Sequence, residues 1–120
     1  MIDVLCIGEL LIEFVADTSN VSLSRSPGFI KAPGGAPANV AVALSRLGVK
    51  SGFMGKVGDD LFGLYLKACL EADNVDTSTL YHDAGTRTTA VFTAVWDDGH
   101  KDLCFYRNPG ADIVFAPDDK

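Results

Sequence analysis

The chain has 120 residues, 48% of them hydrophobic and 22% charged, which is enough to build one domain with a real core. The formal net charge of −6 disfavours nucleic acid and acidic membrane surfaces as partners, because both require clusters of Lys and Arg. Cys6, Cys69 and Cys104 are widely spaced and form no metal-binding motif, so we expect three small core residues in a cytoplasmic protein. The sequence shows neither a secretory signal nor the run of about 18 apolar residues that spans a membrane.

The N-terminal part of the chain predicts three extended segments. Residues 4–7 are an apolar run that ends at a glycine, which is typical of a strand buried on both faces. Residues 10–15 continue extended with one carboxylate, Glu13, among apolar neighbours. A polar loop follows at 17–26, and residues 29–32 form a further extended segment that leads into a glycine pair.

Two helices and a strand are predicted next. A helix over 37–47 begins with Pro37, carries Val40, Leu44 and Leu47 on one face, and ends at a glycine. Residues 50–54 form a strand, and 55–60 a glycine-rich turn. A second helix covers about 60–72, with the apolar stripe Leu61, Leu64, Tyr65, Ala68 and Ala72. This alternation of strands and helices predicts an α/β fold with a parallel sheet.

The last third of the chain predicts an antiparallel hairpin. Residues 88–96 alternate and are rich in β-branched and aromatic residues, and Asp98-Gly99 is a strong two-residue turn signal. Taking those two residues as the turn pairs Phe92 with Phe105 across the hairpin. We therefore expect a small β flap beside the α/β body.

The segment Gly34-Gly35-Ala36-Pro37-Ala38-Asn39 indicates function most directly. Two glycines allow a backbone to lie close to a ligand, and Asn39 falls in the first turn of the following helix, where polar, electron-rich ligands are favoured. A tight turn before a buried helix, with Asn39 as a local cap, is the structural alternative. Neither a P-loop nor a dinucleotide fingerprint matches the spacing, which favours a neutral polar ligand.

Glu13 and Arg107 each have a functional and a structural interpretation. Glu13 is either an edge residue that faces water or an acceptor for two adjacent sugar hydroxyls. Arg107 is either a solvated rim charge or a clamp for a sugar oxygen or a phosphate ester. We expect the backbone of the glycine pair, Asn39 and Arg107 to converge on one polyol.

Four segments together resemble the ribokinase-like (PfkB) family of sugar kinases, and most closely its fructokinases. They are residues 8–15, residues 32–41 with linked glycines at 48 and 58, residues 55–63, and the stretch Phe105-Tyr106-Arg107-Asn108-Pro109-Gly110-Ala111-Asp112. The resemblance covers essentially the whole chain. It implies a three-layer αβα body over residues 1–120, with a β-sheet lid built from about 11–32 and 88–107.

The resemblance also implies roles for individual residues. Glu13 matches an acidic sugar-hydroxyl acceptor that is usually Asp in the family, so the longer side chain puts the choice of sugar in doubt. Gly34 and Gly35 match the backbone against the sugar, and Asn39 matches an amide that bonds its hydroxyls. Phe105 and Arg107 match lid positions that meet the substrate.

An ATP-dependent transfer of phosphate to a sugar, most simply fructose to fructose 6-phosphate, is the implied activity, with Mg²⁺ as the accompanying ion. The family's motif with the catalytic Asp is absent from these residues, so the chain resembles the N-terminal portion of a longer kinase. We expect no catalytic residue here and no activity from the 120 residues alone. Another sugar or a nucleoside as acceptor, and a non-catalytic kinase-like module, stay open. The exposed apolar lid predicts pairing in a homodimer, with Val91, Phe92 and Val95 as candidate contacts.

Overall fold

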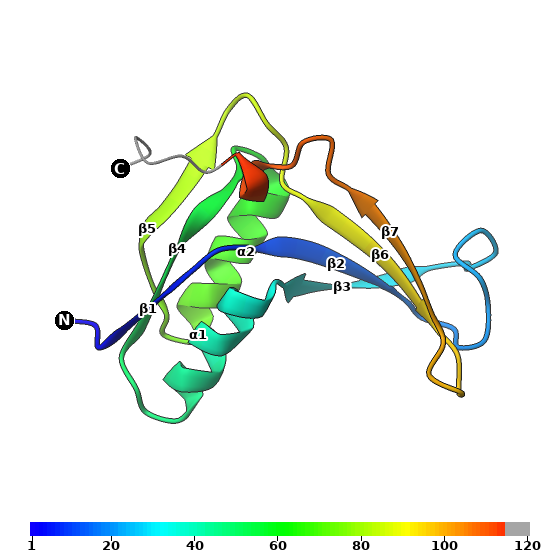
Figure 1. Ribbon diagram of the computed structural model, residues 1–120, viewed down its shortest axis with the longest axis horizontal. Helices are drawn as coiled ribbons and strands as arrows, with labels where there is room; N and C mark the ends of the chain where they lie inside the picture. Colours follow the sequence, from blue (N-terminus) through cyan, green and yellow to red (C-terminus); the bar gives the residue numbers. More distant parts are fainter. Residues whose placement is uncertain (115–120) are drawn as a thin grey trace.

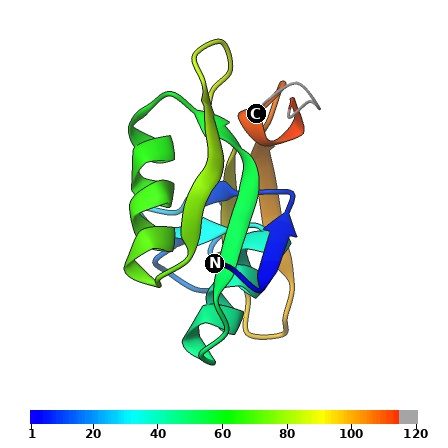
Figure 2. The same ribbon diagram turned by 90° about the vertical axis from the view of Figure 1, so that its left-hand side faces the viewer.

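Two β-sheets and two helices make up the structure, a computed structural model that describes residues 1–114 (Figure 1). The three parallel strands of the base sheet are, in spatial order, β1 (Val4–Ile7), β4 (Ser51–Gly58) and β5 (Asp76–Asp83). The four strands of the outer sheet are, in spatial order, β3 (Phe29–Gly34), β2 (Leu11–Ala16), β6 (Ala90–Val95) and β7 (Lys101–Tyr106). The α/β class and the separate small sheet are both confirmed. In Figure 2 the base strands face the viewer and the outer sheet lies behind them.

The helices α1 (Ala36–Arg46) and α2 (Leu61–Ala72) pack with the base sheet around one apolar core (Figure 1). A short 3₁₀-helix, η1 (Ala111–Ile113), follows the outer sheet. The core brings together buried residues from both helices, the base sheet and the start of β2: Cys6, Leu10, Ile12, Ala38, Ala41, Phe53, Val57, Leu66, Leu70, Val75 and Leu80. No helix among residues 1–114 is long and apolar enough to cross a membrane.

The buried face of each helix matches its predicted face only in part, because Leu44 and Tyr65 of the predicted stripes pack partly buried against the core. In α1 the buried residues are Ala38 and Ala41, whereas Val40 is 51% exposed. In α2 the buried residues are Gly63, Leu66 and Leu70, and the predicted stripe is largely in solvent, with Leu61 82% exposed. Because these helices carry apolar residues on more than one side, periodicity allows several faces, and only packing against the sheet selects one.

The second glycine cluster is part of a strand and not the expected turn. β4 continues through Gly58, and its glycines are there because other backbone segments lie close to it. A Cβ atom at Gly55 would come within 2.7 Å of the Gly8 carbonyl oxygen, and one at Gly58 within 2.5 Å of the Thr88 nitrogen. β5 was not predicted, because its first four residues are all polar and it lacks the apolar run of a buried strand.

The hairpin register differs by one residue from the predicted one. Phe105 lies opposite Val91, and Phe92 lies opposite Cys104. The turn has three residues between the closing pair Trp96 and His100, with Gly99 at φ +90°, and not the two-residue Asp98-Gly99 form. A shift of one residue moves every side chain of β7 to the other face of the sheet.

An aromatic cluster joins the outer sheet to α2. Phe14 stacks on Phe92 at 5.0 Å between ring centroids and meets the Phe62 ring of α2 edge-on at 5.6 Å. The outer sheet is therefore fixed to the body by ring contacts on one face, which leaves its other face for the site.

The prediction that all three cysteines are core residues holds only for Cys6. Cys104 lies in the outer sheet and is exposed, and Cys69 is half-buried.

Candidate functional site

The glycine pair lies where β3 ends and α1 begins. Gly35 caps the helix with φ +106°, a conformation that side chains rarely adopt, and a Cβ atom there would overlap the Glu9 carbonyl oxygen. A Cβ atom at Gly34 would come within 3.0 Å of the Glu13 Oε1 atom. Because neither glycine has a side chain, the β1–β2 connection and the Glu13 carboxylate can both lie close to this backbone.

Glu13 and Phe105 project from the same face of the outer sheet. The ladder places Ala32, Glu13, Val91 and Phe105 side by side in one row across β3, β2, β6 and β7. Directly opposed residues point to the same side of a sheet, so this row puts the carboxylate and the ring on one surface. Glu13 is half-buried and Phe105 is 51% exposed, which leaves both within reach of a ligand.

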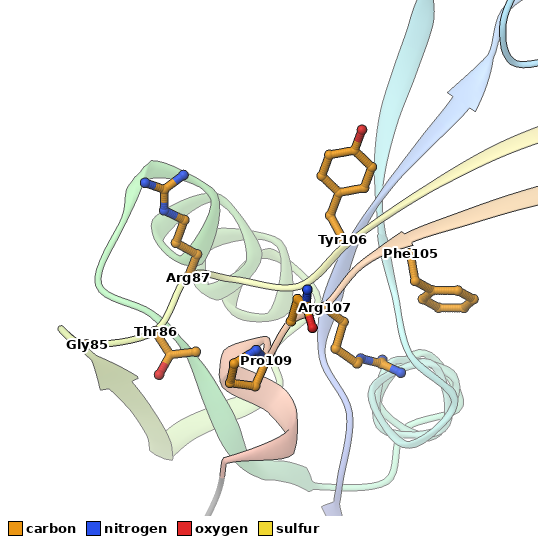
Figure 3. Close-up of a pocket in the computed structure, with 8 residues that line it drawn as sticks. Gly85, Thr86, Arg87, Phe105, Tyr106, Arg107 and Pro109 are labelled. Carbon is orange, nitrogen blue, oxygen red and sulfur yellow. The ribbon is translucent and has the colours of Figure 1, made fainter.

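Arg107 follows β7 and is ion-paired rather than solvated. Its Nη2 atom donates to Glu9 Oε2 at 2.6 Å and to Asp112 Oδ2 at 2.8 Å, and its guanidinium lies 5.1 Å from the centre of the Phe105 ring. Figure 3 shows Arg107 and Phe105 directed away from Tyr106 and toward the helix seen end-on, α1. Since the Glu9 backbone also lies against Gly35, Glu9 connects the arginine to the glycine pair.

Asn39, like Glu13, Gly34 and Gly35, does not line the cavity that Phe105 and Arg107 line. It is exposed in the first turn of α1 and lines a cavity of about 180 Å³ between the two helices, together with Arg46 and Asp73. Phe105 and Arg107 line a different cavity, of about 780 Å³, with six other residues: Gly85, Thr86, Arg87, Tyr106, Asn108 and Pro109 (Figure 3). In this conformation Asn39 and Arg107 share neither of these two cavities, so their convergence on one ligand stays a prediction.

Sequence reasoning missed Glu9 and Asp112, the two carboxylates that hold Arg107. Glu9 is 98 positions away in the chain, so no local pattern connects it to the arginine. Asp112 is only five positions away, but the short helix η1 turns it back toward the strand. The excess of acidic over basic residues is the only sign in the sequence that Arg107 could form ion pairs, and it does not identify which carboxylates are involved.

Asp60 holds the start of the outer sheet to α2. Its side chain caps α2 by accepting from the Gly63 N–H at 2.8 Å, and it accepts from both the N–H and the hydroxyl of Thr88, at 2.9 and 2.7 Å. Burial by itself raises the pKa of Asp60, but the hydrogen bonds from Thr88 and Gly63 outweigh it and hold the pKa below its ordinary value of 3.8. The carboxylate is thus charged at neutral pH and fixes the point where the chain enters β6.

This arrangement can bind a neutral, hydroxyl-rich molecule. The Glu13 carboxylate can accept hydrogen bonds and the Arg107 guanidinium can donate them. Both lie on one surface with the Phe105 ring, beside the backbone of Gly34 and Gly35. Residues 1–114 contain no group of three or more His, Cys, Asp or Glu side chains that could hold a metal ion. The described residues of the site therefore offer contacts that suit a sugar.

Comparison with known proteins decides the family. The model of the pfkB family carbohydrate kinases matches residues 1–120. The chain belongs to the pfkB carbohydrate kinase family. It is 53% identical over 112 residues to a protein named probable fructokinase-3 from Arabidopsis thaliana and 51% identical over 112 residues to a fructokinase from Solanum tuberosum, each covering 93% of the chain.

Solved pfkB family structures have the same fold. The fructokinase from Halothermothrix orenii superposes with a TM-score of 0.86 over 96% of the chain at 35% identity, which is 40% of that protein. A fructokinase from Vibrio cholerae O395 with fructose, ADP and calcium ion bound gives 0.83 over 97% of the chain at 34% identity, 35% of that protein. The chain spans about a third of the length of the curated relatives that it matches, 32% and 35% for the two named above.

Proposed function

We propose that this chain is the sugar-binding part of an ATP-dependent kinase that phosphorylates a hydroxyl of fructose. The observation that carries the proposal is the identity of 53% and 51% to two proteins that bear the name fructokinase, spread over 93% of the chain. Support comes from a structural relative that was solved with fructose and ADP and from another, a sugar kinase of Pyrococcus horikoshii, solved with ATP. The acceptor–donor pair of Glu13 and Arg107 matches a polyol in its chemistry.

The outer sheet then acts as a lid, formed by segments of about 11–32 and 88–107. Glu13 accepts from sugar hydroxyls, Arg107 donates to a sugar oxygen and Phe105 covers the ring. Gly34 and Gly35 allow the sugar to approach the backbone, and Asn39 joins them when the sheet closes. Closure expels water, which favours transfer to the sugar over hydrolysis of ATP.

The catalytic base and most of the ATP site lie outside the chain in this proposal. Residues 1–120 alone are therefore expected to show no fructose-dependent ATP turnover. A longer form that supplies the remaining two-thirds of a typical relative is expected to show it. Turnover by the 120 residues alone would overturn this assignment of roles.

A coupled assay of the full-length protein tests the substrate. Fructose, ribose, 2-keto-3-deoxygluconate and adenosine are compared by kcat/KM, and fructose is expected to be preferred. A preference for one of the other three contradicts fructose as the substrate. Binding of fructose without any turnover favours a kinase-like module that lacks catalysis.

Glu13→Gln tests the site within that assay. The amide keeps the shape of the side chain but loses the charge, so we expect the fructose KM to rise about tenfold or more while the KM for ATP stays unchanged. Glu13→Asp restores the charge on a shorter side chain and is expected to recover part of the loss. An unchanged fructose KM in Glu13→Gln would remove Glu13 from the sugar site.

Pairing of two copies through the outer sheet is part of the same proposal. The earlier candidates Val91, Phe92 and Val95 lie on β6, which is an inner strand, and Val91 is buried. Ile30 and Leu103 on the two edge strands are 65% and 58% exposed and are better placed for such a contact. Light scattering of wild type and Leu103→Asp tests it, with a dimer expected for the first and a monomer for the second.

A cytoplasmic location remains proposed from the free thiols, which suit a reducing compartment.

A further inference from the structure

Hydrogen bonds of three carboxylates gather where the chain passes between the two sheets. We call this region the junction and define it by Glu9, Asp60, residues 88–89, Arg107 and Asp112. Three of the four strands of the outer sheet have such a contact at this end: Glu9 before β2, Thr88 and Thr89 before β6, and Arg107 after β7. The junction is thus the place where an orientation of the outer sheet is fixed.

Asp112 is the most enclosed of the three carboxylates of the junction. Its side chain has no exposed surface, and it accepts from Arg107 Nη2 at 2.8 Å and from the hydroxyl of Thr89, which is itself fully buried. The backbone fixes the same segment, because the Ala111 N–H donates to the Arg87 carbonyl at 2.8 Å. A carboxylate removed from water in this way is stable only while its partners stay in place, so Arg107 is held to it.

Glu9 binds the same nitrogen of Arg107 but in a different environment. Its side chain is 45% exposed, compared with 22% for Arg107 and none for Asp112. An exposed carboxylate can leave an ion pair at small cost because water replaces the lost contact, whereas a buried one cannot. The two partners of Arg107 therefore differ in kind: Asp112 is a fixed partner and Glu9 an exchangeable one.

Arg107 keeps donors that neither carboxylate uses. Both ion pairs are made by Nη2, and the buried Nε atom has no hydrogen-bond partner among residues 1–114. A guanidinium carries five N–H donors, and a buried unpaired donor is rare in folded proteins. This conformation therefore leaves Arg107 with hydrogen bonds still to be made.

We propose that Asp112 is the positioning residue of Arg107. It fixes the guanidinium at the junction so that the remaining N–H donors of Arg107 bind a sugar oxygen. Glu9 is the partner whose contact with Arg107 is released when the sugar binds. This inference rests on the proposed function, in which Arg107 contacts the sugar. It assigns Asp112 no contact with the substrate. It also explains why residue 110 is glycine, because a Cβ atom there would overlap the Thr89 hydroxyl and lie 3.1 Å from Asp112 Oδ1.

Kinetics of the full-length protein with fructose and ATP test the proposal. In Asp112→Asn we expect the fructose KM to rise about tenfold or more, because a charge-assisted contact is lost, while the KM for ATP stays within about twofold. In Glu9→Gln we expect the fructose KM to fall or to stay within about threefold. Asp76→Asn is the matched control, since it makes the same substitution at an exposed carboxylate of the base sheet.

Two results would overturn the proposal. One is an equal rise of the fructose KM in Asp112→Asn and Glu9→Gln. The other is an Asp112→Asn protein that unfolds at lower temperature but keeps every kinetic constant, which is the signature of a purely structural role. If Asp112→Asn does not fold, Gly110→Ala replaces it, because it disturbs Thr89 and Asp112 without changing any charge and at an ordinary φ of −94°.

A second measurement does not depend on which molecule is phosphorylated. In the nitrogen-15 NMR spectrum, the Arg107 guanidinium of wild type is expected to give separate, slowly exchanging Nη signals, identified by their loss in Arg107→Lys. These signals should persist in Glu9→Gln and collapse in Asp112→Asn. Their persistence in Asp112→Asn would overturn the proposal. A wild type without fructose turnover but with this NMR pattern would instead count against the proposed function alone.

Discussion

The base of the molecule and the junction are held together by different forces. The core between α1, α2 and the base sheet is apolar, with Phe53, Leu66 and Leu70 almost completely buried. Hydrogen bonds and ion pairs connect the outer sheet to this body at the junction, among them those made by the carboxylates of Glu9, Asp60 and Asp112. Apolar contacts are strong but non-directional, whereas charged hydrogen bonds fix an angle. The body therefore supplies stability, and the junction supplies the orientation of the site.

Replacing a core residue is the largest expected test of this contrast. Leu66→Ala removes a fully buried side chain of α2 and is expected to cost about 2–5 kcal/mol of unfolding free energy. Leu61→Ala is the matched control on the same helix, where the side chain is 82% exposed, and it should stay within about 0.5 kcal/mol. Urea denaturation of the full-length protein measures both. Equal losses would mean that the Leu61 side chain is buried to the same extent as that of Leu66, which contradicts the observed exposure.

The helix faces show how far periodicity alone can go. Pro37 and the Gly48 stop predict both ends of α1 to within one residue, because those residues act through local backbone geometry. The buried side is decided by contacts with strands that come from elsewhere in the chain. In α2, Leu61 and Leu66 are equally apolar, and only the second meets the sheet.

The hairpin shows that a one-residue error can separate site residues. The strands and the turn region are predictable from β-branched residues and Asp98-Gly99, but the choice between a two-residue and a three-residue turn is not. Pairing Phe92 with Phe105 would have put Phe105 on the face opposite to Glu13. The observed register pairs Val91 with Phe105, and this brings the ring to the side of the carboxylate.

Loss of the Asp60 carboxylate is the next largest test, and it acts at the junction. Asp60→Ala removes the cap of α2 and both bonds to Thr88, so we expect a loss of about 1–2 kcal/mol in unfolding free energy. Asp3→Asn, at an exposed position before β1, is the control and should change little. A loss as large as that of Leu66→Ala would mean that the junction also supplies most of the stability.

The pH dependence of that loss gives an independent check. Because the folded state lowers the pKa of Asp60 below 3.8, its contribution is fully present above the unfolded pKa and is lost as the pH falls through the folded pKa. The difference between wild type and Asp60→Ala should therefore be constant near neutral pH and shrink below about pH 4. A difference that grows on acidification would contradict the lowered pKa.

Thr93→Val is the smallest expected change and locates the end of the junction. Thr93 lies in β6, beyond the junction residues 88–89, and its buried hydroxyl has no hydrogen-bond partner among residues 1–114. Valine has nearly the same shape without the unpaired hydroxyl, so we expect unfolding free energy to rise by up to about 1 kcal/mol. Thr93→Ser keeps the hydroxyl and removes the methyl group, and it should lose about 0.8 kcal/mol. A rise in unfolding free energy with Val and a fall with Ser would show that Thr93 stabilises the protein through apolar packing, as the residues of the body do. A clear loss with Val would show that the hydroxyl is bonded, and that the polar contacts of the junction continue into the outer sheet.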